Sequence, residues 1–125
     1  MTYVKNLEKD TVENEYFRKV LNTTPKSQLV VMSLLPGEDI GEEVHDVDQF
    51  IRIEQGKGRT VLDGEEFPIE DDFAVVIPAG TRHNIINDGE TAMKLYTIYT
   101  PPEHAEGTIH KTKDEAMAAE EHYEG

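Results

Sequence analysis

Short runs in which apolar and polar residues alternate fill the middle of the chain, and turn residues separate these runs. Alternation with a period of two is typical of β-strands that have one buried face. The pair Asp63-Gly64 lies between two such runs, and this dipeptide is a strong signal for a β-hairpin. Many short strands with frequent turns predict an all-β barrel or sandwich over residues 27–100. The predicted strands are Ser27–Leu35, Gln49–Glu54, Arg59–Leu62, Glu65–Ile69, Phe73–Ile77, Arg82–Ile86 and Thr91–Thr100.

The N-terminal residues 1–26 have a different pattern. Residues 1–10 show no clear period and are predicted to form an arm. Thr11–Leu21 is predicted to form a short helix, and Pro25 follows soon after its end, as expected because the residue before a proline disfavours helix. Four larger side chains would share one face of this helix, namely Tyr16, Phe17, Val20 and Leu21.

The C-terminal residues 101–125 form a tail in this interpretation. Pro101-Pro102 ends the β region. Thr112 and Glu115 have the spacing of a capping box, in which each side chain binds a backbone N–H group at a helix start. We therefore predict a surface helix from Lys113 to about Glu121. No linker or internal repeat divides the chain, so we expect a single domain.

Composition excludes several classes of function. Twelve Lys and Arg residues against 26 Asp and Glu residues give a formal net charge of −14, which disfavours binding to nucleic acid. The chain has no cysteine, so a metal ion would have to be held by His, carboxylate or amide groups. It has no apolar run long enough to cross a bilayer and no apolar segment typical of a signal peptide. We therefore expect a cytoplasmic protein without a membrane partner.

Four polar side chains are predicted to meet inside the barrel. Glu43 and His45 are two residues apart, so both project from the same face of an extended strand. Gln49 shares its strand face with two isoleucines, whereas charged residues occupy the opposite face. His83 shares its face with Ile85 by the same alternation. A polar group on an apolar inward face needs hydrogen bonds or a metal ion. A shift of one residue in register would replace Glu43 by Glu42.

The spacing of these residues resembles the first sequence motif of the cupin superfamily. That motif reads G-x5-H-x-H-x3-4-E-x6-G, and the corresponding positions here are Gly37, Glu43, His45, Gln49 and Gly56. Every spacing fits. Glu43 stands where the family usually has its first His, and Gln49 stands where it usually has Glu.

A second motif follows at the expected separation. It reads G-x5-P-x-G-x2-H-x3-N, and Pro78, Gly80, His83 and Asn87 match it, with Asp72 in place of the leading Gly. The resemblance covers about residues 27–100. It implies a cupin-type double-stranded β-helix, or jelly-roll barrel, to which the predicted N-terminal and C-terminal helices are added.

The resemblance also implies one divalent transition metal ion, with Glu43, His45, Gln49 and His83 as its ligands. Two imidazoles, a carboxylate and an amide oxygen retain the single negative charge of the usual ligand set. These donors suit Zn, Fe(II), Mn, Ni or Co, and the sequence does not choose among them. The alternative is a metal-free barrel in which the four side chains form a buried hydrogen-bond network with every member satisfied.

Further candidates lie outside the motifs. Tyr99 is expected to face inward, where it would contact a substrate or donate a proton, or would be a core tyrosine with one satisfied hydroxyl. His104 and His110 follow the barrel, and a folded-back tail would bring one of them to its mouth; the alternative is a surface location. Arg59 would face inward and bind an anion if its strand alternates with Val61.

The chain is similar to small stand-alone cupins that are often likened to sugar-phosphate isomerases. This implies a metal-dependent enzyme with isomerase-type or lyase-type chemistry on a small polar molecule such as a sugar or keto acid. The alternatives are an Fe(II)-dependent dioxygenase that uses Glu43, His45 and His83, and a non-catalytic module that binds a small ligand. We also expect a homodimer, because Tyr96 and Ile98 are predicted to be exposed on the outer sheet face.

Overall fold

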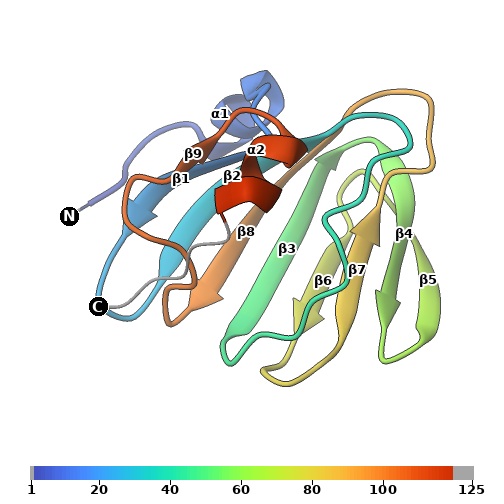
Figure 1. The fold of residues 1–125 in the computed structure, drawn as a ribbon. Coiled ribbons are helices and arrows are strands. Elements are labelled where there is room, and N and C mark those ends of the chain that lie inside the picture. The colour runs from blue at the N-terminus through green and yellow to red at the C-terminus, as the bar shows by residue number, and fades with distance from the viewer. Residues whose placement is uncertain (1, 120–125) are drawn as a thin grey trace.

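Two antiparallel β-sheets and two short helices make up the computed structural model, which describes residues 2–119 (Figure 1). The larger sheet has six strands in the order β6-β3-β8-β2-β1-β9, and the smaller has three in the order β5-β4-β7. The elements are α1 (Leu7–Glu13), β1 (Arg18–Thr23), β2 (Gln28–Leu34), β3 (Asp48–Gln55), β4 (Lys57–Leu62), β5 (Glu65–Glu70), β6 (Ala74–Ile77), β7 (His83–Ile86), β8 (Met93–Thr100), β9 (Ile109–His110) and α2 (Lys113–Ala119). The predicted all-β jelly roll is confirmed.

The seven predicted strands are all present, with ends that differ by no more than two residues. Chain order and sheet order differ: β8, near the end of the barrel, pairs with β2 on one side and with β3 on the other. Many strands that are neighbours in a sheet are therefore not consecutive in the chain. This crossing between the sheets brings residues near 30, 50 and 97 side by side.

The predicted N-terminal helix is wrong in position. Helix α1 is Leu7–Glu13, and the side chain of Asn6 caps it by accepting a hydrogen bond from the Lys9 amide at 3.0 Å. Residues 18–21 of the predicted helix belong instead to β1, which pairs antiparallel with β2. Pairing with the sheet buries Phe17 and Val20, the side chains that suggested a helical face. A weak helical pattern was overridden by the hydrogen bonds that a sheet edge offers.

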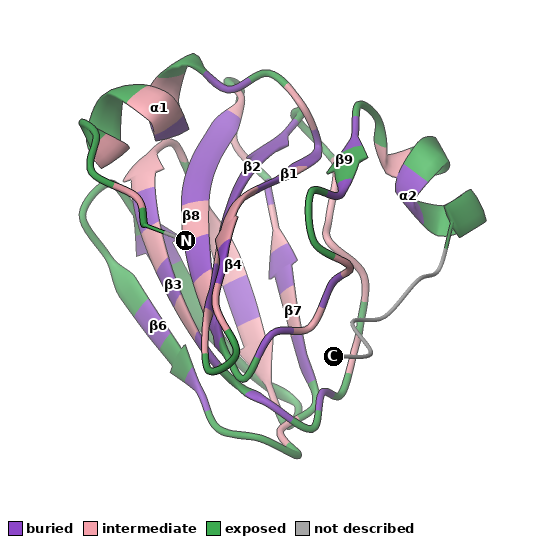
Figure 2. Ribbon diagram, turned by 90° about the vertical axis from the view of Figure 1, so that its left-hand side faces the viewer, coloured by how far each residue is buried: buried purple, intermediate pink, exposed green. Residues whose placement is uncertain are grey.

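The apolar core lies between the two sheets and comes from the inward faces of their strands. Figure 2 shows buried bands that alternate with less buried ones along the strands, as the period of two predicts. Each fully buried large side chain contributes roughly 1.5–3 kcal/mol to stability. Gly58 allows a close approach here, since a Cβ atom at this position would lie 2.0 Å from the Ile86 carbonyl oxygen. The most buried apolar side chains include Met32, Leu34, Ile51, Ile53, Ile85, Met93 and Leu95.

The segment after the barrel folds back over it. Strand β9 pairs with β1, and helix α2 follows. The Thr112 hydroxyl accepts a hydrogen bond from the Glu115 amide at 3.1 Å, so the predicted start of this helix is confirmed. Its predicted end near Glu121 lies outside the described residues. Lys113 forms an ion pair with Asp39, which joins the helix to the loop that precedes the candidate site.

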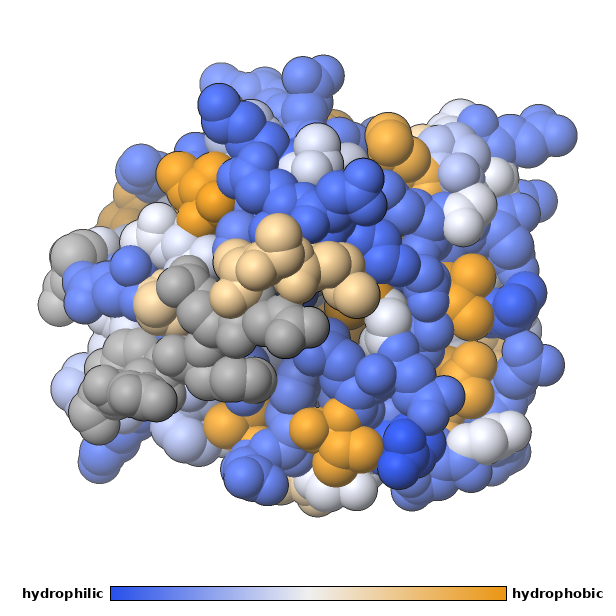
Figure 3. Space-filling model, viewed as in Figure 1, coloured by the Kyte–Doolittle hydropathy of each residue, from blue (hydrophilic) through white to orange (hydrophobic). Residues whose placement is uncertain are grey.

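The outer surface in the view of Figure 1 is mostly hydrophilic, with separate apolar spots (Figure 3). This agrees with the strongly acidic composition. No helix within residues 2–119 is long and apolar enough to cross a membrane.

Candidate functional site

Backbone pairing brings Glu43 and His83 together at one end of the barrel. The two residues form an isolated antiparallel bridge in which each amide donates to the other carbonyl oxygen at 2.9 Å. His45 Nε2 lies 3.0 Å from Glu43 Oε2. The rings of His45 and His83 are in edge contact, with centroids 4.9 Å apart. Three of the four predicted ligands therefore form one cluster. Glu42 instead pairs with Arg82 at 2.9 Å on the surface, so the register predicted for Glu43 holds.

The ring of His83 is oriented by a backbone carbonyl. Its Nδ1 donates to the Thr81 oxygen at 2.8 Å, so in the neutral ring Nε2 carries the free electron pair. A hydrogen bond of this kind on the rear nitrogen is typical of histidines that bind metal ions. Burial lowers the pKa of His83, which favours the neutral ring that such binding requires.

Gln49 adds an amide oxygen without a hydrogen-bond partner. Its Nε2 donates to Thr97 Oγ1 at 3.1 Å, whereas its Oε1 is buried and accepts no hydrogen bond from residues 2–119. Nδ1 of His45 is likewise buried without a partner, although Gln49 is close enough to contribute to raising the His45 pKa. A buried oxygen that accepts nothing is costly. Among the described residues, one polar atom each of Gln49 and His45 is thus left without a hydrogen bond in the network that the metal-free alternative requires.

Glu43 and His45 shift each other's protonation in opposite directions. Burial alone would raise the pKa of Glu43, but the hydrogen bond and charge of His45 and the charge of Arg18 outweigh it, and the pKa is lowered. Burial alone would lower the pKa of His45, but the hydrogen bond and charge of Glu43 raise it. The pair therefore favours a carboxylate beside a protonated imidazole when nothing else binds there.

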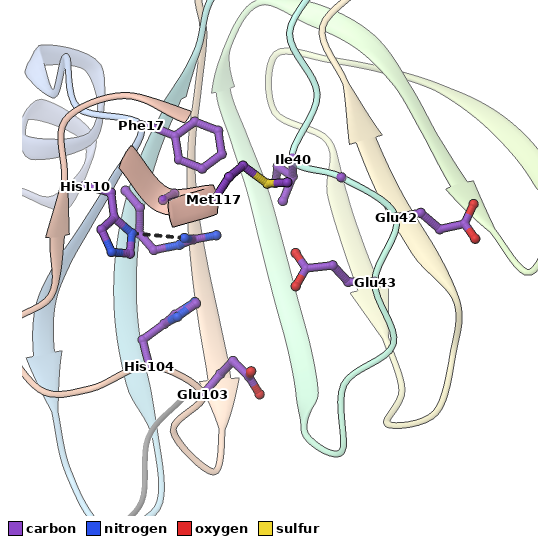
Figure 4. A pocket seen from close by; sticks show the side chains of 11 residues that line it. Phe17, Ile40, Glu42, Glu43, Glu103, His104, His110 and Met117 are labelled. Atoms are coloured by element: carbon purple, nitrogen blue, oxygen red, sulfur yellow. Dashed lines mark hydrogen bonds between the residues drawn. The ribbon is translucent and has the colours of Figure 1, made fainter. Parts of the chain in front are cut away.

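A cavity of about 420 Å³ opens beside this cluster. Figure 4 shows Glu43 on one wall and His104 and His110 on the opposite wall, with Glu103 between the two walls at one end. Arg18 also lines the cavity, and its Nη1 donates to His110 Nδ1 at 3.2 Å, which is the dashed line in Figure 4. The volume suits a small molecule. The cavity thus has an acidic side and a side with cationic and imidazole groups.

The donor atoms of the cluster are of the kinds that bind a divalent transition metal ion, although His45 and Glu43 are hydrogen-bonded to each other. Within residues 2–119, no three His, Asp or Glu side chains stand ready at metal-binding distance. The hydrogen bond between His45 and Glu43 occupies donor atoms that a metal ion would use. The partnerless oxygen of Gln49 and the orientation of His83 are the two observations that favour the fit.

Tyr99 and His104 lie directly behind the cluster. The ring of Tyr99 contacts His45 and His104 with centroid separations of 5.9 and 5.2 Å. Its hydroxyl lies 3.4 Å from His104 Nε2, and burial raises its pKa above the usual range. Tyr99 faces inward as predicted but is not among the residues that line the cavity. His104 and His110 are both buried at the cavity, so the tail does fold back to the mouth.

The prediction that Arg59 faces inward is wrong. Thr60, not Arg59, is the buried residue of this part of β4. The Arg59 side chain is 42% exposed and pairs with Glu66 at 3.0 Å and Asp88 at 3.2 Å. Its neighbours on the adjacent strands set the register, and alternation with Val61 pointed to the wrong face. Arg59 is therefore a surface ion-pair residue and is not among the residues that line the cavity.

Three residues of the site were missed by sequence reasoning. Arg18 was assigned to a helix, and Glu103 lies in an irregular segment without a pattern. Gln28 is fully buried, and its amide oxygen accepts from the backbone amides of Glu103 and His104 at 3.3 and 3.0 Å. It thereby fixes that segment over the cavity. A glutamine at the start of an apolar strand was the available signal.

Comparisons with known proteins agree with this architecture. A family model described as "Cupin domain" matches residues 30–99. The chain is 49% identical to the uncharacterized protein YrkC of Bacillus subtilis (strain 168) over 126 residues, which covers 95% of this chain and 68% of YrkC. It is 47% identical to the uncharacterized protein L612 of Acanthamoeba polyphaga mimivirus over 113 residues, or 86% of this chain and 70% of L612.

A solved structure extends the agreement to three dimensions. The crystal structure of BH2720 from Bacillus halodurans matches with a TM-score of 0.92 and 43% identity, covering 94% of this chain and 95% of that one. The fold predicted from the two motifs is therefore shared with relatives along nearly the whole chain. The chain belongs to the cupin superfamily.

Proposed function

We propose that this protein is a metal-dependent enzyme that acts on a small polar molecule held in the cavity beside Glu43. Glu43, His45, Gln49 and His83 would hold one divalent transition metal ion. The observation that carries the proposal is the buried amide oxygen of Gln49, which accepts no hydrogen bond from residues 2–119 and whose side chain helps to raise the pKa of His45, a member of the cluster with Glu43 and His83. A metal ion would give that oxygen a partner and would replace the hydrogen bond between His45 and Glu43.

When bound, the ion supplies Lewis-acid polarisation of a carbonyl or hydroxyl oxygen. The protein side chains have separate tasks. The hydrogen bond from His83 Nδ1 to Thr81 keeps Nε2 available as a ligand. Glu43 is the one member of the set that also lines the cavity, so substrate would meet the cluster at this residue. Isomerase-type or lyase-type chemistry needs, in addition, a group that moves a proton.

Glu103 is the residue placed to move this proton. Its carboxylate lines the cavity, and its Oε2 lies 4.0 Å from His45 Nε2. Its position is fixed because Gln28 holds its backbone amide. A carboxylate on a different wall from Glu43 would reach another atom of the same substrate. The roles of metal ligand and proton carrier are thus assigned to different residues.

The metal site is tested by elemental analysis of purified protein after loading with Zn, Fe(II), Mn, Ni or Co. We expect about one equivalent of one metal in the wild type, almost none in His83→Ala, and a lower affinity in Gln49→Ala. His110→Ala is the matched control, because it removes a histidine from the same cavity but not from the proposed ligand set. Absence of metal from wild-type protein after every loading would overturn the proposal.

Catalysis is tested with the metal-loaded protein and a panel of sugars and keto acids, analysed by mass spectrometry and NMR. Turnover that is lost in Glu103→Gln while metal content stays unchanged would support the assigned roles. Oxygen consumption by the iron-loaded protein would favour dioxygenase chemistry instead. Binding of panel members by loaded protein without any chemical change would identify a binding module and would contradict the enzyme proposal.

The proposed assembly is a homodimer. Tyr96 and Ile98 are partly exposed on the outer face of β8, and the Tyr96 ring lies 6.5 Å from that of Phe50. Light scattering of the purified protein measures the mass in solution, and a monomeric mass would refute the dimer.

A further inference from the structure

Arg18 is the buried arginine of this structure, and it has no counter-ion among the described residues. It is 8% exposed. The other three arginines, at positions 52, 59 and 82, all form ion pairs with carboxylates and have more exposed side chains. No carboxylate of residues 2–119 lies within ion-pair distance of Arg18. A buried guanidinium without a negative partner is costly, because arginine stays charged at any ordinary pH.

The contacts that Arg18 does make leave its charge unneutralised. Its Nη1 donates to His110 Nδ1, which is an uncharged acceptor. Its Cζ lies 5.3 Å from the centroid of the Phe17 ring, a contact that holds the guanidinium against β1. Its Nε is buried and has no hydrogen-bond partner among residues 2–119. Arg18 is therefore a cationic hydrogen-bond donor that lines the cavity and lacks a negative partner among the described residues.

The cavity places this donor opposite the proposed metal cluster. Arg18 and Glu43 both line it, and the charge of Arg18 helps to lower the Glu43 pKa, so the two groups interact electrostatically. A molecule that spans the cavity would therefore meet a cation at one end and the cluster at the other. The surrounding carboxylates of Glu42, Glu43 and Glu103 disfavour a ligand with more than one negative charge.

We propose that Arg18, supported by His110, binds the carboxylate of a small hydroxy or oxo monocarboxylate in this cavity. A guanidinium presents several donors in a plane and matches a carboxylate in charge and shape. The hydroxyl or carbonyl oxygen of the same molecule would lie at Glu43. This assignment rests on the proposed function, since it narrows the small polar substrate to an acid. The neutral sugars of the broader proposal would lack the group that neutralises Arg18.

Matched pairs of acids and neutral analogues test the assignment by calorimetry. The acids are lactate, pyruvate and gluconate, and their analogues are propane-1,2-diol, acetone and glucitol. We expect at least one acid to bind the metal-loaded wild type about 10- to 100-fold more tightly than its analogue, the range expected for a hydrogen bond to a charged group. Arg18→Gln should remove this preference, and Arg18→Lys should retain part of it. Arg59→Gln is the matched control and should bind like the wild type, because Arg59 lies outside the cavity.

The possible results distinguish failure of the proposed acid-binding subsite from failure of the proposed metal-dependent enzyme. Failure of all three acids to bind, or equal affinity for acids and analogues, would overturn the subsite even if metal is bound. An acid preference that survives in a folded Arg18→Gln protein would also overturn it. If Arg18→Gln does not fold, as judged by circular dichroism, the comparison of Arg18→Lys with the wild type decides. An acid preference in a protein that takes up no metal would support the subsite and refute the proposed function.

Discussion

The two ends of the barrel interior differ in chemistry although the same strands build both. At one end, Gln28, Tyr99 and Gln49 are in register across β2, β8 and β3. Farther along the same inward faces, Met32, Leu95 and Ile53 are in register instead. On β7, His83 belongs to the polar end and Ile85 lies two residues farther on. Each inward face therefore changes from polar to apolar along its strand.

The barrel contains buried polar atoms without hydrogen bonds at one end and an apolar core at the other. Among residues 2–119, His45 Nδ1 and Gln49 Oε1 are buried without hydrogen bonds, and both lie at the polar end, where His45 contacts the Tyr99 ring and Gln49 pairs with Tyr99 across the sheet. The apolar end consists of side chains that need no polar partner. Burial there supplies stability, whereas buried polar atoms without hydrogen bonds cost free energy at the polar end. The comparison predicts different responses to mutation at the two ends.

The largest effect is expected from Leu95→Ala at the apolar end. The side chain is fully buried between Met32 and Ile53, so its truncation leaves a cavity and should cost about 2–5 kcal/mol of unfolding free energy in urea. Val76→Ala is the control, because Val76 is 65% exposed and its loss should change little. Metal content of folded Leu95→Ala protein should equal that of the wild type. A loss of metal alongside stability would show that the two ends are not independent.

A smaller loss of stability is expected from Gln28→Leu at the polar end. The variant removes four hydrogen bonds, to Thr23, to the Glu103 amide and to both backbone groups of His104, and should cost about 1–3 kcal/mol. Hydrogen exchange at residues 103 and 104 should become faster. Gln49→Leu is the matched variant: it removes a single hydrogen bond and a partnerless oxygen, so its unfolding free energy should change less. Equal losses of unfolding free energy in both variants would contradict the assignment of a structural role to the Gln28 amide and a ligand-binding role to the Gln49 amide.

The pH dependence of stability should separate the two ends further. Because the Glu43 pKa is lowered in the folded protein, its stabilisation is present above its unfolded pKa and is lost as pH falls through the folded value. Because the His45 pKa is raised, its stabilisation is full below its unfolded pKa and is lost as pH rises through the folded value. In metal-free protein, Glu43→Gln should flatten the curve of unfolding free energy against pH in both ranges. Leu95→Ala should lower the curve and keep its shape. An unchanged curve for Glu43→Gln would contradict the mutual pKa shifts of Glu43 and His45.

The smallest effect is expected from Arg59→Ala on the outer surface. Its ion pairs with Glu66 and Asp88 are exposed, so the variant should lose at most about 1 kcal/mol, and less at high salt. Urea unfolding at two salt concentrations measures this. A larger loss would mean that the surface pairs contribute as much as the polar end.

Local pattern was enough to predict the strands and half of the site. The period of two placed Gln49, His83 and Tyr99 on inward faces, and the motif spacing selected Glu43 and His45; the structure brings these residues together. Side-chain direction in a strand depends on neighbouring residues alone, so the sequence carries it. The same rule failed for Arg59, because its strand has partly exposed residues on both faces and the pattern is weak.

The residues on the opposite wall of the cavity could not be predicted from local pattern. Arg18 comes from a segment with a helical pattern, and Glu103 and His110 come from a segment without a clear period. Each reaches the site through a long-range contact: β1 pairs with β2 and β9, and Gln28 binds the segment of Glu103. The residues 11–21 favoured a helix locally, but hydrogen bonds to β2 made residues 18–23 a strand. Local alternation together with the motif spacing was enough to predict the barrel and the members of the proposed ligand cluster. The buried arginine faces that cluster because strand pairing between distant residues, which no local pattern records, gained more free energy than a short helix would have.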